Sequence, residues 1–281
     1  MLRRDIRPSE LADRAEAVDG AFDELWIVED LPYAGGIAQL GHVLAATEHA
    51  RIGHGIAPTP FRNSAALAME WAALADMYPG RLIAGLGHGV QDWMGQIGGA
   101  VESPLTLLRE TLQAVRGLLS GAKVTTNGRY VNLNQVELKF PPTEVPPVLA
   151  GVTGPRSLRL AGAKADGTIL PEGHGPEEII NARLRIDQGR AEADRTDHHH
   201  LTVFAAFYVG SPGELGPPPE GSSGPSWLAM STDVEEVSAS LHTIITAGAD
   251  SLILVPIGPS PHYQLEIAAS QIVPDLRNML D

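Results

Sequence analysis

The chain has 281 residues, 43% of them hydrophobic, and a formal net charge of −14. This length and apolar content suffice for one large domain with a substantial core. The acidic balance argues against a nucleic-acid partner, because nucleic-acid binders normally carry a basic excess or stripe. No cysteine is present, which excludes disulfides, thiolate metal sites and cysteine nucleophiles among these residues.

Neither a membrane span nor a secretory signal is expected. No apolar run approaches the length that crosses a bilayer, and the opening MLRRDIRPSE lacks the apolar segment of a signal peptide. We therefore expect a cytoplasmic protein that acts on a small molecule, without a membrane partner.

Strand-like and helix-like patterns alternate along the chain. Helices are expected over 8–20, 36–47, 63–78, 103–119, 156–164, 176–193, 233–247 and 263–280. Strands are expected over 24–28, 51–57, 81–86, 147–150, 167–170, 201–209 and 251–255. Such alternation indicates βαβ units and a parallel sheet. The number of units predicts an α/β fold, a (β/α)8 TIM barrel, as a single domain over 1–281.

Three segments depart from this regular pattern. Residues 123–139 alternate with period two around Asn127-Gly128, which predicts a β-hairpin insertion. Residues 210–226 are rich in Pro, Gly and Ser and predict a flexible loop. Only MLRRDI precedes the first helix, so the first strand is expected to be short or truncated.

The carboxyl ends of the strands carry the candidate chemistry, because barrel enzymes place their sites there. Two strands end in glycines that bracket a histidine, at 53–55 and at 87–89. Glycine allows the main chain to approach a flat ligand closely. This pattern predicts that the two ends form a rest for such a ligand.

Polar residues at these ends have both functional and structural interpretations. Glu29 and Asp30 are candidate general acids, or solvated loop residues. His54 and His88 are candidate metal ligands with a carboxylate, or polar pocket and capping residues. We favour the second interpretation and expect no metal site. Trp93 follows Gly89 and either walls a pocket or packs in the core.

Residues 150–157, AGVTGPRS, form the most informative loop. A strand ends at Gly151, and Pro155-Arg156-Ser157 opens a helix whose free N–H groups favour an anion such as phosphate. The alternative is an ordinary turn with proline in the first helical position. His198-His199-His200 precede a strand at the opposite end of the barrel and are expected in a solvated turn.

Taken together, these stretches resemble the luciferase-like monooxygenase superfamily, specifically the group that uses the deazaflavin coenzyme F-420. The resemblance is carried by FDELWIVEDLP (22–32), RIGHGIAPTPFRN (51–63), DMYPGRLIAGLGHGVQDWM (76–94), SPLTLLRETLQAVRGLLSG (103–121), PVLAGVTGPRSLRLAGAKADGTILPEG (147–173) and AGADSLILVP (247–256). It implies a (β/α)8 barrel and a cis peptide bond at Gly55–Ile56. The first strand is short relative to the family.

The resemblance also implies an activity and a set of site residues. The expected enzyme transfers a hydride between the deazaflavin, coenzyme F-420, and an unidentified small organic substrate. The rivals are an FMN-dependent monooxygenase, a degenerate barrel without catalytic activity, and a metal hydrolase. Glu29, Asp30, His54, His88 and Trp93 would serve catalysis. Gly55, Ile56, Gly87, Gly89, Gly151, Thr153, Gly154, Pro155, Arg156 and Ser157 would bind the cofactor.

Two further expectations concern the partner copy and the cofactor tail. Helix 63–78 carries more apolar residues than one buried stripe requires, and family members often pair through this region, so a homodimer is expected. Coenzyme F-420 carries a phosphate and an oligoglutamate tail, which an acidic protein binds only through a local basic patch. Arg51, Arg62, Arg81 and Arg156 are the basic residues expected nearest the strand ends.

Overall fold

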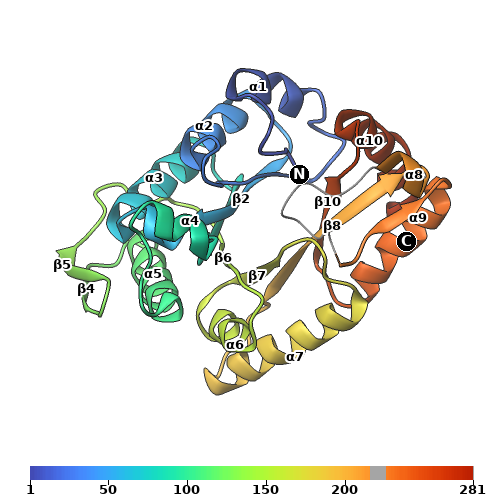
Figure 1. The fold of residues 1–281 in the computed structure, drawn as a ribbon. Helices are drawn as coiled ribbons and strands as arrows, with labels where there is room; N and C mark the ends of the chain where they lie inside the picture. Colours follow the sequence, from blue (N-terminus) through green and yellow to red (C-terminus); the bar gives the residue numbers. More distant parts are fainter. Residues whose placement is uncertain (216–225, 281) are drawn as a thin grey trace.

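The computed structural model describes residues 1–215 and 226–280. A parallel sheet curls around the centre of the molecule, and helices cover its outer face (Figure 1). The strands of this sheet are β1 (Glu24–Ile27), β2 (Arg51–Pro58), β3 (Leu82–Gly87), β6 (Val148–Gly151), β7 (Gly167–Leu170), β8 (His200–Val209) and β10 (Ser251–Pro256), in that order, with β9 (Ala229–Ser231) beside β8.

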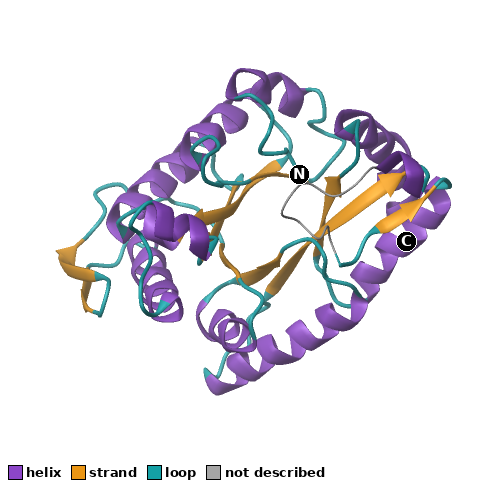
Figure 2. Ribbon diagram, viewed as in Figure 1, coloured by secondary structure: helices purple, strands orange, loops and turns teal. Residues whose placement is uncertain are grey.

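The helices lie mostly between consecutive strands, as Figure 2 shows. They are α1 (Pro8–Glu16), α2 (Gly36–Ala46), α3 (Ser64–Met77), α4 (Gln91–Gln96), α5 (Pro104–Leu119), α6 (Pro155–Lys164), α7 (Pro176–Glu192), α8 (Pro212–Leu215), α9 (Val234–Thr246), α10 (Pro261–Ile267) and α11 (Val273–Asn278), with short non-α turns Thr59–Phe61 and Ala268–Ile272. The seven expected strands and the main helices are present within a few residues of their predicted bounds. Among the described residues, no helix has the length and apolar character to cross a membrane.

Residues 1–7 contain no strand, and the sheet is open between β10 and β1. Two backbone groups lie in that gap. The Met1 nitrogen donates to the Leu254 carbonyl at 2.7 Å, and the Leu2 N–H donates to the Trp26 carbonyl at 2.9 Å. Residues 1 and 2 therefore stand where a first strand would join the two edges.

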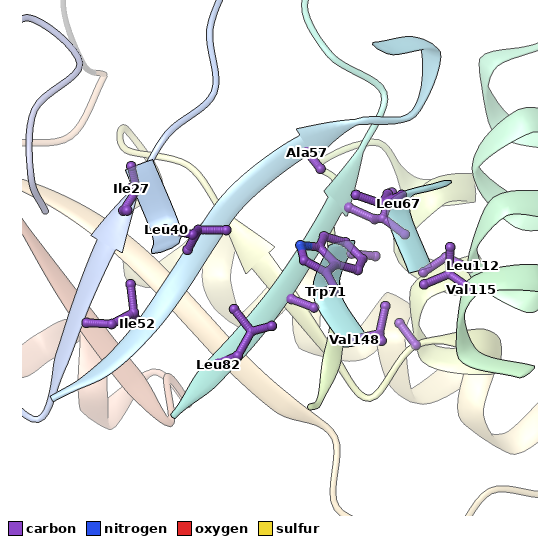
Figure 3. Packing of buried hydrophobic residues seen from close by; sticks show 14 of the residues in the cluster. Ile27, Leu40, Ile52, Ala57, Leu67, Trp71, Leu82, Leu112, Val115 and Val148 are labelled. Carbon is purple, nitrogen blue, oxygen red and sulfur yellow. The ribbon is translucent and has the colours of Figure 1, made fainter. Parts of the chain in front are cut away.

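The outer face of the sheet packs against the helices through one large apolar cluster (Figure 3). Trp71 of α3 is fully buried between the strands and α5, near Leu82 and Leu112. Of the apolar residues on α3, Leu67, Trp71, Ala72, Leu74 and Ala75 are buried. The exposed pair is Met69 and Met77, at 61% and 60%.

The inner face of the sheet carries a separate apolar cluster. Its members are Trp26, Ile83, Leu149, Ile169, Phe204, Ile253 and Val255, with Ile56 packed against them. Because successive side chains of a strand point to opposite faces, each strand supplies both clusters. The inner cluster fills the middle of the curled sheet, so the structure has a packed interior there and no open pore.

Strand β2 has an irregularity that determines which of its residues face the inside of the sheet. Its pairing with β3 is regular up to His54 and resumes at Ala57, which indicates a bulge. Ile52 and Ala57 belong to the outer cluster, while Ile56 packs on the inner one. The bulge therefore turns two consecutive residues, Gly55 and Ile56, to the inside. The Gly55–Ile56 peptide bond is cis, as the resemblance implies.

Residues 124–136 form an antiparallel pair outside the parallel sheet, β4 (Val124–Asn127) and β5 (Asn132–Val136). An antiparallel pair is therefore present in the segment predicted to form a hairpin, and residues 128–131 connect its two strands. The carboxylate of Glu110, on α5, accepts the backbone N–H groups of Arg129, Tyr130 and Val131. These bonds satisfy backbone N–H groups of the connection that have no partner within a tight turn.

Other short elements escaped prediction. Helix α4 and strand β9 lie in segments for which no helix or strand was predicted. Most of the expected flexible loop 210–226 lies outside the described residues. The predicted solvated turn at 198–200 is only partly correct. His198 is exposed, but His199 is 2% exposed and its Nε2 lies 2.8 Å from Thr168 Oγ1.

Replacing Gly53 by alanine should destabilise the protein strongly. A Cβ at this position would lie 2.2 Å from the ring of the fully buried Trp26. Overpacking of this kind costs roughly 1–3 kcal/mol or more. The midpoint of urea unfolding measures the effect. Gly95→Ala is the matched control, because nothing lies within 4 Å of its added Cβ and it stands in α4. Equal stability of the two variants would contradict the packing of Trp26 on Gly53.

Candidate active site

A cavity of about 810 Å³ opens at the carboxyl ends of the parallel strands. Its volume is within the range of pockets that hold drug-sized ligands and cofactors. Its floor is apolar and belongs to the inner cluster, with Ile56, Ile169, Phe204 and Val255. Its polar wall comes from the N-terminal segment, with Arg3 and Arg4, and from loops that follow the strands, with Glu29, Asp30, His88, Thr153 and Glu172.

Most of the residues predicted for the site line this cavity. They are Glu29, Asp30, Gly55, Ile56, His88, Gly89, Trp93, Gly151, Thr153 and Gly154. The lining does not include the other five predicted residues, which are His54, Gly87, Pro155, Arg156 and Ser157. Gly87 still shapes the floor together with Gly151. A Cβ on either glycine would lie within 3.0 Å of the Ile56 side chain.

The placement of His54 contradicts a direct catalytic role. Its side chain is fully buried on the outer face of β2, where Trp71 Nε1 lies 3.4 Å from its Nδ1. Its Nε2 lies 3.5 Å from Glu29 Oε2. The alternation of β2 explains this orientation, because His54 has the same parity as Ile52. His54 is therefore part of the wall behind the cavity.

Glu29 is held by a dense set of donors. Arg62 bonds it with both terminal nitrogens, at 2.6 and 2.5 Å, and the Gly36 N–H donates to Oε1 at 2.7 Å. Burial alone would raise the pKa of Glu29, but the contacts with His54 and Arg62 outweigh it and lower that pKa to about 2. The carboxylate is therefore ionised at neutral pH, which does not favour Glu29 as a general acid.

Asp30 and Trp93 meet at Arg4 on the cavity wall. Arg4 Nη1 donates to Asp30 Oδ2 at 2.8 Å. The Arg4 guanidinium also lies 5.0 Å from the ring centroid of Tyr33 and 5.9 Å from that of Trp93. These distances are typical of cation–π contacts. The cluster fixes one cation and two aromatic rings at the edge of the cavity.

His88 follows β3 directly and faces the cavity. Its Nε2 lies 3.2 Å from the hydroxyl of Ser157, at the start of α6. Its Nδ1 is buried and has no hydrogen-bond partner within the described residues. Burial lowers the pKa of His88, so the ring is neutral at pH 7. Solvent does not reach this nitrogen, so the His88 ring lines the cavity through its other atoms.

The loop 152–154 leads from β6 into α6 beside His88. Gly154 precedes the helix with extended backbone angles, and Pro155 occupies the first turn. Thr153 and Gly154 line the cavity, while the Arg156 side chain is exposed nearby in sequence. The free N–H groups of this helix start therefore lie at the cavity's edge.

The sequence analysis did not identify several residues that line the cavity. Arg3 and Arg4 were missed, although their position in the only segment available for a first strand was a usable signal. Glu172 follows β7 at a recognised strand end, but no role was assigned to it. Phe204 is in the middle of β8 and carried no signal.

Two of the four basic residues expected near the cavity lie elsewhere. Arg51 begins β2, and Arg81 precedes β3, where it bonds the Thr47 and Ala50 carbonyls. Both positions are at the amino ends of strands, opposite the cavity. Arg62 is bound to Glu29. Arg3 and Arg4 also line the cavity, but they pair with Asp5 and Asp30, so fewer unpaired basic groups lie near the cavity than expected.

The family follows from comparison with known proteins. Residues 4–214 match the family described as luciferase-like monooxygenase. The chain belongs to that family. The resemblance inferred from the sequence is thereby confirmed.

Individual relatives agree with this membership. The chain is 32% identical over 189 residues to a 5,10-methylenetetrahydromethanopterin reductase of Methanolobus tindarius, covering 67% of this chain and 57% of that protein. It is 32% identical over 190 residues to an F420-dependent glucose-6-phosphate dehydrogenase of Nakamurella multipartita, covering 63% and 56%. The matched region thus spans little more than half of each relative's length.

The fold extends over nearly the whole chain. The structure of a coenzyme F420 dependent tetrahydromethanopterin reductase from Methanopyrus kandleri superposes with a TM-score of 0.82, covering 97% of each chain at 20% identity. At this identity the comparison shows the fold, and the luciferase-like family supplies a TIM-barrel framework for the curled sheet described above.

The Glu29 ion pair should make stability depend on pH. Because its pKa falls from 4.5 to about 2 on folding, its stabilisation is complete above about pH 4.5 and is lost as pH falls toward 2. The shift corresponds to about 3 kcal/mol. In urea unfolding, Glu29→Gln should be less stable than wild type at pH 7, and the difference should shrink between pH 5 and pH 3.

A matched control uses an exposed pair. Glu102 contacts Arg129 at the surface, with 81% of its side chain exposed, and Glu102→Gln should leave the pH profile unchanged. If the stability difference between wild type and Glu29→Gln stayed constant with pH, that result would contradict the lowered pKa of Glu29.

Proposed function

We propose that this luciferase-like protein is a deazaflavin-dependent oxidoreductase that acts on a small organic substrate. The observation that carries the proposal is the apolar-floored cavity at the carboxyl ends of the strands, built over the β2 bulge at Gly55–Ile56. When bound, coenzyme F-420 would supply hydride transfer. The family relatives named for F420-dependent activities support this choice of cofactor over FMN.

The residues present fit a flat ring with an anionic tail. Ile56, Gly55 and Phe204 offer an apolar floor for the ring. His88 lines the wall and, with Ser157 3.2 Å from its Nε2, offers a polar contact there. The N–H groups that open α6, with Thr153 and Arg156, would hold the phosphate. Ile56, Gly55, Phe204, His88 and Thr153 line the cavity, while Arg156 is exposed at the start of α6.

Two groups are suited to hold or move protons at the site. Neutral His88 lines the cavity, and its ring, with Nε2 3.2 Å from the Ser157 hydroxyl, can accept a proton there. Glu172 lines the cavity and has no hydrogen bond or ion pair to another described residue. Glu29 and Asp30 differ from it, because each carboxylate is already bound by an arginine. We assign the proton-handling role to His88 and Glu172 and positioning roles to Glu29 and Asp30.

Direct titration tests the cofactor. The purified protein should bind coenzyme F-420 more tightly than FMN, and the F-420 affinity should fall more steeply with salt, because its oligoglutamate tail adds contacts that salt screens. Isothermal titration calorimetry at low and high salt measures both. Tighter FMN binding at both salts would support the monooxygenase alternative, and binding of neither would support a degenerate barrel.

Replacing Arg156 by glutamine should weaken binding of coenzyme F-420. Loss of one charge-assisted contact to phosphate reduces affinity by roughly tenfold to a hundredfold. Arg159→Gln is the matched control, since Arg159 is on the same helix and pairs with Glu192. Affinity unchanged in Arg156→Gln, or equally reduced in both variants, would refute a phosphate site at this helix start.

We also propose that the protein forms a homodimer through α3. Met69 and Met77 are exposed apolar residues on this helix, and burial of such surface favours association. Light scattering should give twice the monomer mass at micromolar concentration, and Met69→Glu with Met77→Glu should return the monomer. A monomeric wild-type protein would contradict the dimer.

A further inference from the structure

We propose that His198, His200 and Asp250 bind a divalent transition metal of the zinc type at the amino ends of β8 and β10. One ring nitrogen of each histidine and one carboxylate oxygen lie within 4.8 Å of one another. The cluster is at the end of the sheet opposite the cavity. The proposal is therefore independent of the proposed oxidoreductase activity.

The spacing within the cluster suits direct coordination. His198 Nε2 lies 3.2 Å from Asp250 Oδ1. In a tetrahedral zinc site with bonds of about 2.0–2.1 Å, two ligand atoms are separated by about 3.3 Å. Two of the three ligands thus already stand at the spacing that such a site requires. The His198 side chain is 70% exposed, which leaves it free to adjust and leaves room for a water ligand.

The carboxylate is oriented by groups outside the cluster. Asp250 Oδ2 accepts the Leu201 N–H at 2.7 Å and Arg183 Nη2 at 3.0 Å. These bonds occupy one oxygen and leave Oδ1 directed toward His198. Supporting hydrogen bonds of this kind orient the ligands of natural metal sites.

His200 is also held in place. Its Nε2 lies 2.8 Å from the hydroxyl of Ser251, which donates to Glu24 Oε1 at 3.2 Å. His200 is the first residue of β8, and Ser251 is the first residue of β10. Because both begin paired strands, the backbone fixes their separation. The second histidine is thus preorganised by the sheet itself.

The local charges favour zinc over magnesium or calcium. Asp250 and Glu24 face two guanidinium groups, those of Arg183 and Arg51, so the surroundings are close to neutral. A hard cation that depends on carboxylates gains little from such surroundings. Imidazole nitrogens are ligands that zinc and its neighbours in the first transition series prefer. The two histidines would therefore supply most of the affinity.

A bound metal would join the segment before β8 to the residue before β10. Any ligand that binds only the folded state stabilises it. This end of a barrel serves stability, while chemistry takes place at the other. We therefore assign the site a structural role.

The test uses protein without an affinity tag, since a histidine tag would itself bind zinc. After treatment with a chelator, Zn²⁺ titration by calorimetry should show one saturable equivalent, and excess Zn²⁺ should raise Tm by about 5 °C. His198→Ala and His200→Ala should each weaken binding at least tenfold. Mg²⁺ should give no response.

The control variant is His262→Ala. His262 Nε2 contacts Glu266 Oε1 at 3.2 Å on an exposed helix, so it measures adventitious binding to a surface His–Glu pair. It should bind Zn²⁺ as wild type does. The absence of a saturable equivalent, or wild-type affinity in His198→Ala, would overturn the site. His198 is exposed, so this variant decides the question even if His200→Ala fails to fold.

Discussion

Pairing between β2 and β3 stops at His54 and resumes at Ala57, and much of the molecule around the cavity depends on this interruption. Before it, the strand directs His54 outward to the helices. After it, Ile56 turns inward and rests between Gly87 and Gly151, whose missing side chains leave the space. A strand in perfect register would have placed an outward residue where the cavity needs its floor.

Strand β2 also links the cavity floor to the charged residues of the cavity wall. His54 lies behind the cavity and contacts Glu29, which Arg62 also binds. A buried carboxylate is stable only with such partners, because removal of one leaves an uncompensated charge. Arg4 plays the equivalent part for Asp30 nearer the surface. The acidic residues of the site therefore divide into two whose carboxylates arginines bind and one, Glu172, that forms no hydrogen bond or ion pair with another described residue.

The sequence predicted the framework well, because helix and strand periodicities are local properties. It also located the cavity, since parallel strands bring their carboxyl ends together. The orientation of His54 was not predictable in the same way. The glycines at 53 and 55 carry no side chains, so the alternation that marks an inner and an outer face is erased there.

Other features depended on contacts between distant segments. Arg62 is 33 residues from Glu29, and nothing local indicates their ion pair. Arg4 reaches Asp30 across 26 residues, from a segment without regular structure. The carboxylate of Glu110, on α5, binds backbone N–H groups in the connection between β4 and β5. In each case a side chain from elsewhere decides the local geometry.

We propose that this cavity holds the ring of a deazaflavin against the β2 bulge. A crystal structure of the protein grown with coenzyme F-420 tests it most directly. We expect electron density for the ring over Ile56, with a polar atom of the ligand near the His88 ring and the phosphate at the start of α6. Density for the ring at any other place on the protein would contradict it.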